Sequence, residues 1–479
     1  MKKLLIIAAP VLLALPACKK DLSAYNTNNK AASTVPAASL FLAGEKNLSD
    51  YYEQPSGSYN VFRQFAQSWT GSTYTTEARY VLSAYNSPNN WWLQLYTSVL
   101  NNLGNAKALF PVSVTDPATL RNDLIVTDIL EVYTYNLLVS TYGNIPYSKA
   151  ENRLVPFPAY DDAKTVYMDL LTRLDSCIAN INTGAPSLGK SDQIYAGNTA
   201  AWKKFAATLK LKMAMVLADT DPATASKKVQ EAVSAGVFTS NADNARFVYQ
   251  TTPTGNTNPV WQALVNSGRH DFVPANLMLN TLKNWNDPRL PLYFTKASDS
   301  TYKGGVPGGG NSVGSLSTFS AQWSGTTWPT DMLDYAETEF LLAEATERGF
   351  ITGASAEQHY NNGITASIQY WGGTTTQAQT YLAQTAVAYT TATGDYKQKI
   401  AWQEWIAMAD RGWDAWTLIR RLKQPNIDAI SAPLGAASHL PMRFYYPPTE
   451  QTANPTNWAA AVKAMGGTDD VNTKLFWIP

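Results

Sequence analysis

Four glutamates lie close together in one short stretch of the chain and are the first candidates for chemistry. They are Glu337, Glu339, Glu344 and Glu347. A glycosidase needs two carboxylates roughly 5–10 Å apart across a cleft. Glu337 and Glu344 are seven residues apart, which places them on one helix face about 10 Å apart along its axis. The same spacing is typical of a helix face that contacts water or pairs with Arg348, so we predict no catalytic residue here.

The other residue types that catalyse reactions or bind metals are sparse. The three histidines, His270, His359 and His439, are far apart in the sequence, and no Cys, His or Asp spacing matches a transition-metal site. The glycine-rich run 304–314 lacks the Lys-Ser/Thr that follows a phosphate-binding loop. No Gly-x-Ser-x-Gly nucleophile motif is present. The sequence therefore predicts a protein that is not an enzyme and needs neither a metal nor a cofactor.

Cys18 carries the most specific chemical signal. Lys2 and Lys3 precede an apolar run, 4–15, that is too short to span a bilayer but has the length of a signal-peptide core. The run leads into Leu-Pro-Ala-Cys at 15–18, which resembles a lipobox, where the cysteine takes up a diacylglyceryl group before cleavage. We predict a signal peptide over 1–17 and lipidation of Cys18. The alternative is an ordinary secretory signal with an incidental cysteine.

The residues that follow Cys18 predict a tether. Residues 18–35 are rich in Ser, Thr, Asn and Ala and lack apolar periodicity, as is typical of a flexible linker between a lipid anchor and a globular domain. With Cys18 lipidated, Cys177 has no partner for an internal disulfide. It lies in an apolar helical stripe, so we expect it to be a buried hydrophobic residue.

Composition favours a neutral, polar ligand. The chain has 37 basic and 37 acidic residues, and charged residues make up 15% of it, against about 25% in ordinary domains. This balance, without runs of like charge, excludes a nucleic-acid-binding protein. Aromatic residues reach 12%, with 15 Trp and 26 Tyr. Rings together with abundant amides and hydroxyls suit the binding of a hydroxyl-rich ligand, although most of the rings are expected to fill the core.

Apolar spacing is helical over most of the chain. One example runs from Ala163 to Ile178 in steps of three and four, with Asp161 or Asp162 as its N-cap. Further stripes of this kind run over 120–139, 202–217, 333–345, 360–371 and 400–422. Short glycine-containing turns such as 348–355 favour stacked helical hairpins. Residues 238–329 instead are rich in Thr, Asn, Gly and Pro, which predicts a long irregular segment with a functional role.

Several sequence blocks resemble the SusD-like (SusD/RagB) family of outer-membrane lipoproteins. The block YGNIPYSKA at 142–150 is similar to the family signature YGDxPYSEA, with Asn144 and Lys149 as the departures. Further blocks follow in the family's order: DQIYAGN at 192–198, WKKFAATLKL at 202–211, DPR at 287–289, YAE at 335–337, LLAEA at 341–345, WQEWIA at 402–407 and PMRFYYP at 441–447. Each block is weak alone, but the set covers most of the chain.

The resemblance implies an all-α fold of tetratricopeptide-like helical hairpins with a loop-rich ligand face, formed by a single domain over 36–479 with the loop-rich insertion around 238–329. It also implies a cell-surface, lipid-anchored protein of the outer membrane that captures an oligosaccharide and passes it to a SusC-like TonB-dependent transporter. Its conserved-looking blocks are expected to be scaffold, with Trp202, Trp402 and Trp405 as core rings.

Ligand contacts in such a protein should come from its loops. Two segments join rings to small polar residues, 67–74 and 322–328. We predict that the stacking platforms are Trp69, Tyr74, Trp323 and Trp328. Arg79 and Gln322 are the predicted hydrogen-bonding residues. Trp91 and Trp92 open a helical stripe and are expected in the core.

Three alternatives to a glycan-binding protein are left open by the sequence. The ligand can be a peptide, because stacking and amide hydrogen bonds serve both classes. A surface glycoside hydrolase would require a carboxylate pair in the cleft and measurable turnover. A protein that only caps the transporter would have no affinity for any soluble ligand.

Overall fold

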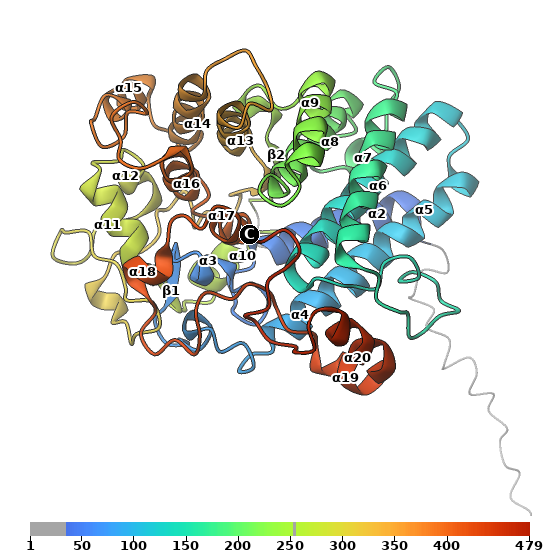
Figure 1. The fold of residues 1–479 in the computed structure, drawn as a ribbon, viewed down its shortest axis with the longest axis horizontal. Coiled ribbons are helices and arrows are strands. Elements are labelled where there is room, and N and C mark those ends of the chain that lie inside the picture. The colour runs from blue at the N-terminus through green and yellow to red at the C-terminus, as the bar shows by residue number, and fades with distance from the viewer. Residues whose placement is uncertain (1–34, 252–254) are drawn as a thin grey trace, which may run out of the picture. The chain divides into compact units, whose positions relative to one another are not determined.

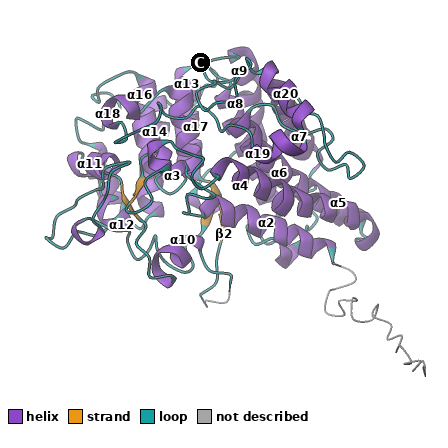
Figure 2. Cartoon of the chain, turned by 90° about the horizontal axis from the view of Figure 1, so that it is seen from below, coloured by secondary structure: helices purple, strands orange, loops and turns teal. Residues whose placement is uncertain are grey.

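The computed structural model describes residues 35–251 and 255–479. The predicted signal peptide, the lipidation site Cys18 and the tether up to residue 34 lie outside the described residues. Residues Pro36–Pro479 form one compact unit. Helices dominate this unit, and its described strands form two short pairs (Figure 2). The predicted all-α fold is confirmed.

The long helices pack as neighbouring pairs, which confirms the predicted helical hairpins (Figure 1). The pairs are α6 (Pro117–Tyr142) with α7 (Ala163–Asn180), α8 (Thr199–Val216) with α9 (Pro222–Ala235), and α13 (Tyr335–Glu347) with α14 (Ala356–Tyr370). α7 also packs against α8, and α2 (Ala37–Glu53) packs against α5 (Asn101–Ser113). Each pair buries the apolar stripes that the sequence pattern predicted.

Several of these helices start at an Asp, Asn or Ser whose side chain caps the first turn. The Asp162 carboxylate accepts a 2.8 Å hydrogen bond from the Thr165 amide at the start of α7, which confirms one of the two predicted caps. Asn198 caps α8, and Asp334 caps α13 through the Glu337 amide at 2.7 Å. Such a cap contributes about 1 kcal/mol by satisfying an amide that the helix leaves unpaired.

The predicted stripe over 400–422 is interrupted and forms two helices, α16 (Tyr396–Ala407) and α17 (Gly412–Leu422). α17 packs against the short helix α3 (Phe62–Phe65). A Cβ on Gly412 would lie 2.3 Å from the Arg63 amide nitrogen. The glycine therefore permits the close contact between the start of α17 and α3. The break between α16 and α17 lets α17 take the direction in which it packs against α3.

Shorter elements complete the chain outside the irregular segment. They are α4 (Ser87–Gln94), the π-helix η2 (Leu95–Leu100), α15 (Thr375–Leu382), α18 (Ile427–Ser431), α19 (Pro448–Ala453) and α20 (Pro455–Ala464), with 3₁₀ turns η1 (Glu77–Arg79) and η3 (Gly189–Ser191); a third such turn, η4 (Asn241–Asp243), lies at the start of the irregular segment.

The irregular segment around 238–329 contains only short elements. They are β2 (Ala245–Phe247), α10 (Pro259–Trp261), the π-helix η5 (Gln262–Asn266), β3 (Phe272–Pro274), α11 (Asn276–Asn284), α12 (Leu290–Tyr293) and the 3₁₀ turn η6 (Val313–Ser315). β3 pairs antiparallel with β1 (Trp69–Gly71), and β2 pairs antiparallel with β4 (Thr330–Leu333). The first pair joins this segment to the N-terminal part of the chain.

The core contains the scaffold rings that the sequence placed there. Trp91, Trp92, Trp202 and Trp405 are buried, whereas Trp402 is half-buried at the edge of the core. Cys177 is buried and unpaired, as expected for a hydrophobic residue in the α7 stripe.

Candidate ligand-binding site

Three of the four rings predicted as stacking platforms lie in the core. Trp69 is 1% exposed, Trp323 is 0% exposed and Trp328 is 8% exposed. A ring can stack on a sugar only when one face is open, and these rings have none. The prediction is corrected for the three tryptophans, and a packing role takes its place.

The three tryptophans belong to one aromatic cluster, which we call the aromatic core cluster: Trp69, Phe272, Tyr293, Phe294, Phe319, Trp323, Trp328 and Trp371. Trp69 and Phe319 have ring centroids 4.1 Å apart, and Trp328 and Trp371 lie 4.5 Å apart. Six of its eight rings belong to the irregular segment, and the other two are Trp69 and Trp371. Polar loops of this kind need buried rings to hold them, because they form few hydrogen bonds within regular elements.

The two predicted hydrogen-bonding residues line neither of the two cavities described below. Arg79 is half-buried, and its Nε donates a 2.6 Å hydrogen bond to the carbonyl of Gly308 in the glycine-rich run. This contact fixes the run to η1, so Arg79 has a positioning role there. Gln322 is exposed and borders none of the cavities described below.

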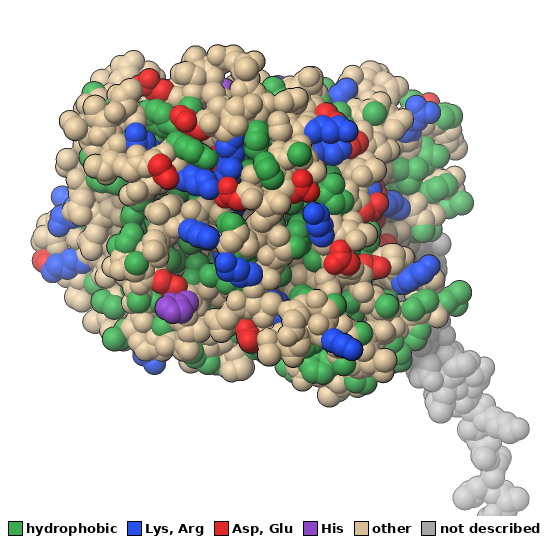
Figure 3. Space-filling view, viewed as in Figure 1, with side chains coloured by type: hydrophobic (Ala, Val, Ile, Leu, Met, Phe, Trp, Pro, Cys, Tyr) green, Lys and Arg blue, Asp and Glu red, His purple; other side chains and the backbone are tan. Residues whose placement is uncertain are grey.

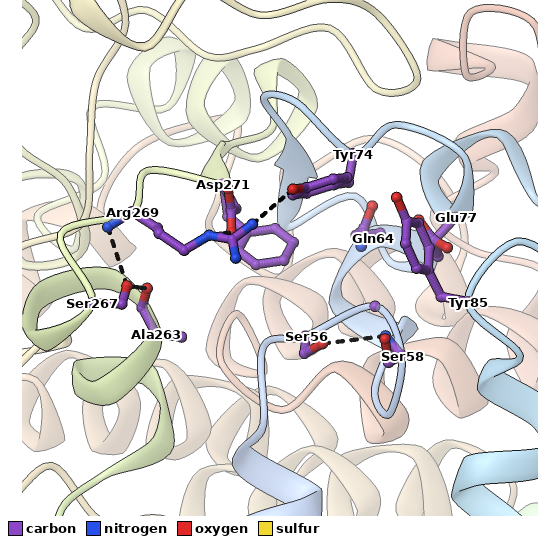
Figure 4. Close-up of a pocket in the computed structure, with 12 residues that line it drawn as sticks. Ser56, Ser58, Gln64, Tyr74, Glu77, Tyr85, Ala263, Ser267, Arg269 and Asp271 are labelled. Atoms are coloured by element: carbon purple, nitrogen blue, oxygen red, sulfur yellow. Dashed lines mark hydrogen bonds and ion pairs between the residues drawn. The ribbon is translucent and has the colours of Figure 1, made fainter.

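Tyr74 is the predicted ring that lies at the surface, with 40% of its surface exposed. It lines a cavity of about 380 Å³ (Figure 4). The lining residues are Ser56, Gly57, Ser58, Gln64, Tyr74, Glu77, Tyr85, Ala263, Ser267, Arg269, Asp271 and Phe272. This volume is within the range of small-molecule pockets, about 300–1,000 Å³. We call it the Tyr74 pocket.

Strand pairing between β1 and β3 brings the two halves of the Tyr74 pocket together. Gly71 pairs with Phe272, so the residues after β1 lie beside those before β3. The Ser72 amide extends the pairing by donating a 2.8 Å hydrogen bond to the Asp271 carbonyl. The chain then turns so tightly that a Cβ on Gly71 would lie 2.2 Å from the Tyr74 carbonyl oxygen. Glycine at 71 is therefore required for Tyr74 to reach the pocket.

Two tyrosines and an arginine form the rim of the pocket. The rings of Tyr74 and Tyr85 meet edge to face, with centroids 5.7 Å apart. The Arg269 guanidinium lies over the Tyr74 ring at 5.4 Å and donates a 2.9 Å hydrogen bond to its hydroxyl. Asp271 pairs with Arg269 at 2.8 Å. Figure 4 shows Arg269 extending toward Tyr74 from the opposite side of the pocket, so both chain segments hold the ring in place.

Two buried hydrogen-bond acceptors line the pocket. Glu77 is 1% exposed, and its Oε1 has no hydrogen-bond partner. The Oε1 of the buried Gln64 is likewise without a partner. Burial raises the pKa of Glu77, although its backbone amide and the Thr76 hydroxyl oppose the shift. An unpaired buried oxygen costs about 1–3 kcal/mol.

The glutamates of α13 are engaged in ion pairs and hydrogen bonds. Glu337 pairs with Lys212 at 2.8 Å and with Arg411, and Glu344 pairs with Arg348 at 2.8 Å and with Arg421. Glu339 contacts His359 at 2.6 Å, and Glu347 accepts a hydrogen bond from Tyr389 at 2.6 Å. Removing one member of a buried pair costs about 3–5 kcal/mol. These carboxylates hold α13 in the scaffold.

Sequence reasoning missed most of the pocket. The residues that were not predicted are Gln64, Glu77, Tyr85, Arg269 and Asp271. The signal that could have been used is local: Tyr74, Glu77 and Tyr85 follow a short extended stretch within twelve residues. Arg269 and Asp271 gave no such signal, because their position depends on the pairing of β1 with β3.

A family model described as "Starch-binding associating with outer membrane" matches residues 28–447. The chain belongs to the SusD-like family. Among solved structures, a chitin-binding protein is 26% identical, with 92% of this chain and 100% of that chain covered and a TM-score of 0.78. A chitin-binding SusD homologue from Flavobacterium johnsoniae is 24% identical, with 92% and 98% covered and a TM-score of 0.78.

A SusD homologue from Bacteroides uniformis is 24% identical, with 92% of this chain and 99% of that chain covered and a TM-score of 0.77. No curated protein matches the chain. The two homologues at 24% identity show the SusD-like fold of this chain and nothing finer.

The surface of this SusD-like protein shows charges mixed with uncharged polar groups. On the face drawn in Figure 3, basic and acidic side chains are scattered singly among uncharged atoms. Within residues 35–251 and 255–479, no helix has the length and apolar character needed to cross a membrane. The same residues contain no group of three or more His, Cys, Asp or Glu placed to hold a metal ion.

Proposed function

We propose that this SusD-like protein is a cell-surface lipoprotein that binds a neutral oligosaccharide in the Tyr74 pocket without cleaving it. The observation that carries the proposal is the combination of an exposed tyrosine ring with residues that carry side-chain oxygens, Ser56, Ser58, Gln64 and Glu77, around one cavity. Sugar C–H faces stack on such rings, and sugar hydroxyls donate to such oxygens. The 26% identical chitin-binding relative supports a glycan ligand, so oligomers of N-acetylglucosamine are the first ligands to test.

The test is a calorimetric binding screen of the protein from Lys19 onward against chito-, cello- and malto-oligosaccharides and against peptides. We expect one glycan class to bind and the same glycan to be recovered intact. Tyr74→Ala should weaken that binding. Binding of peptides alone would move the proposal to peptide capture, and absence of all binding would favour a protein that only caps its transporter.

Recovery of cleaved glycan would identify a hydrolase. Two carboxylates, Glu77 and Asp271, do line the pocket, and Asp271 is paired with Arg269. If the screen detects turnover, the variants Glu77→Gln and Asp271→Asn will show whether either carboxylate is needed for glycan cleavage. We expect neither the wild-type protein nor these variants to release a shorter sugar.

The membrane location and the partner form the second part of the proposal. The family description names an association with the outer membrane, and the lipobox-like sequence at 15–18 supports an anchor at Cys18. We propose that the lipoprotein passes its ligand to a SusC-like TonB-dependent transporter. Cys18→Ser should abolish labelling with a radioactive fatty acid and move the protein out of the membrane fraction. Crosslinking in whole cells should join the wild-type protein to an outer-membrane barrel.

A further inference from the structure

A second cavity lies next to the Tyr74 pocket. It has a volume of about 490 Å³ and is lined by Lys46, Asp50, Tyr51, Gln54, Gly255, Thr257, Pro259, Gln262 and Ala263. We call it the Tyr51 pocket. Ala263 lines both pockets, so the two cavities are neighbours at this residue.

The same two chain segments form walls of both pockets. Gln54 lines the Tyr51 pocket, and Ser56 and Ser58, a few residues further on, line the Tyr74 pocket. On the other wall, the π-helix η5 contributes Gln262 to the Tyr51 pocket and Ala263 to both, and Ser267 at its end lines the Tyr74 pocket. π-Helical turns occur frequently at functional sites. The smallest side chain of this wall thus lies where the two pockets meet.

The chemistry of the Tyr51 pocket matches that of the Tyr74 pocket. Tyr51 is half-buried and lines the pocket, and its ring centroid lies 5.9 Å from that of Tyr59. The Oδ1 of Asp50 is buried without a hydrogen-bond partner, as are the Oε1 atoms of Gln64 and Glu77. Each pocket therefore combines aromatic surface with at least one oxygen that can accept a hydrogen from a ligand.

The charged groups of both pockets select against an acidic ligand. Lys46 is paired with Asp50, and Arg269 is paired with Asp271. Both cations that line the pockets are thus already neutralised, whereas the carboxylate of Glu77 has no cationic partner in the Tyr74 pocket. A uronate or sulfate would lie near this carboxylate without an available cation. A neutral chain of hydroxyl-bearing sugars has no such cost.

We propose that the two pockets are subsites of one groove that binds an extended, neutral oligosaccharide, with the sugar chain passing over Ala263. This inference rests on the proposed function of the Tyr74 pocket. Since each pocket has a volume in the range of small-ligand sites, a ligand that fills only one leaves the acceptors of the other unused. Affinity should therefore rise with the number of sugar units until both pockets are occupied.

The experiment compares the dimer and the hexamer of β-1,4-linked N-acetylglucosamine by calorimetry, with cello- and malto-oligosaccharides of the same lengths as further probes. We expect the hexamer to bind at least tenfold more tightly than the dimer. Gln54→Ala should remove this gain and leave dimer affinity unchanged, whereas Gln379→Ala, on the exposed face of α15, should change neither. An acidic hexamer, hexagalacturonate, should not bind.

A second pair of variants tests the junction between the pockets. Ala263→Trp should remove the gain for the hexamer by filling the point where the pockets meet. Val265→Trp adds the same ring to the same π-helix at a position that is 49% exposed and lines neither pocket, so it should leave both affinities unchanged. Thermal unfolding of both variants shows whether the ring disturbs the fold.

The outcomes separate this inference from the proposed function. Equal affinity for dimer and hexamer, or an unchanged hexamer affinity in both Gln54→Ala and Ala263→Trp, would overturn the extended groove. If Tyr74→Ala still weakened both lengths in that case, the proposed function would stand with a single pocket. If none of the three sugar series bound at either length, the proposed function and the groove would both be overturned.

Discussion

The aromatic core cluster and the Tyr74 pocket contain the same type of side chain in opposite roles. Trp69 belongs to the cluster and Tyr74 to the pocket, although only four residues separate them. β1 ends between them, and the turn at Gly71 directs the chain from the interior to the surface. The difference shows that rings close together in a polar stretch can be buried or exposed, and Phe272, in β3, belongs to both regions.

The largest expected effect is on stability and comes from removing one ring of the aromatic core cluster. Trp323→Ala should lower the free energy of unfolding by about 3–5 kcal/mol, because it removes a fully buried ring and leaves a cavity. Denaturant unfolding measures this change. Gln322→Ala, the exposed neighbour, should change stability by less than about 0.5 kcal/mol. If Trp323→Ala had wild-type stability but did not bind the ligand, Trp323 would be a stacking platform for the ligand and not a packing residue.

The second effect concerns the pocket ring. Tyr74→Ala should weaken binding of the glycan identified by the screen about tenfold, or about 1.4 kcal/mol, with little change in unfolding. Tyr302→Ala is the matched control, because Tyr302 also carries a cation over its ring, Lys296 at 6.0 Å, and lines neither pocket. Equal affinities of the two variants would show that the Tyr74 face contributes nothing specific.

Helix positions and pocket composition differed in how far the sequence could predict them. The apolar steps of α7 and the cap at Asp162 are local properties of neighbouring residues, so the spacing of residue types was enough to predict them. Tyr74 and Arg269 are 195 residues apart and are brought together by the three residue pairs between β1 and β3. Trp323 and Tyr74 both lie among small polar residues, and this local pattern does not indicate which ring is buried. The scaffold was therefore predictable, whereas the pocket was predicted only at Tyr74.

A smaller effect tests how Arg269 supports the pocket ring. Arg269→Met keeps most of the side-chain length but removes the cation over Tyr74 and the hydrogen bond to its hydroxyl. Exposed cation–π contacts contribute about 0.5–1 kcal/mol, so we expect affinity to fall about two- to fivefold. Lys296→Met makes the equivalent change at Tyr302 and should leave affinity intact. A loss of affinity as large as that of Tyr74→Ala would indicate direct contact between Arg269 and the ligand.

The smallest effect is a dependence of binding on pH through Glu77. Because burial raises the pKa of Glu77, its carboxylate becomes protonated on acidification before an exposed glutamate would. Protonation removes an acceptor for sugar hydroxyls, so affinity should fall about two- to threefold as pH decreases through this raised pKa. Glu77→Gln keeps a neutral acceptor and should flatten the profile measured by calorimetry between pH 8 and pH 4.

The comparison of wild type and Glu77→Gln isolates the titration of Glu77. A change of pH through the pKa of Glu77 affects stability and ligand affinity in opposite directions. A raised pKa in the folded protein means that folding favours the protonated form, so the contribution of Glu77 to stability is lost as pH rises through the folded pKa. Parallel pH profiles of the two proteins would exclude Glu77 from ligand binding.

The β1–β3 pair also determines when the binding site can exist during folding. Gly71 and Phe272 are partners across about 200 residues of intervening chain, so closing this loop carries an entropy cost that local hairpins avoid. Helical hairpins such as α8 with α9 can form from neighbouring segments, but the Tyr74 pocket must wait until residue 272 has been synthesised and docked. Ligand affinity is therefore a late marker of maturation, and chains that end before β3 should contain helix without being able to bind.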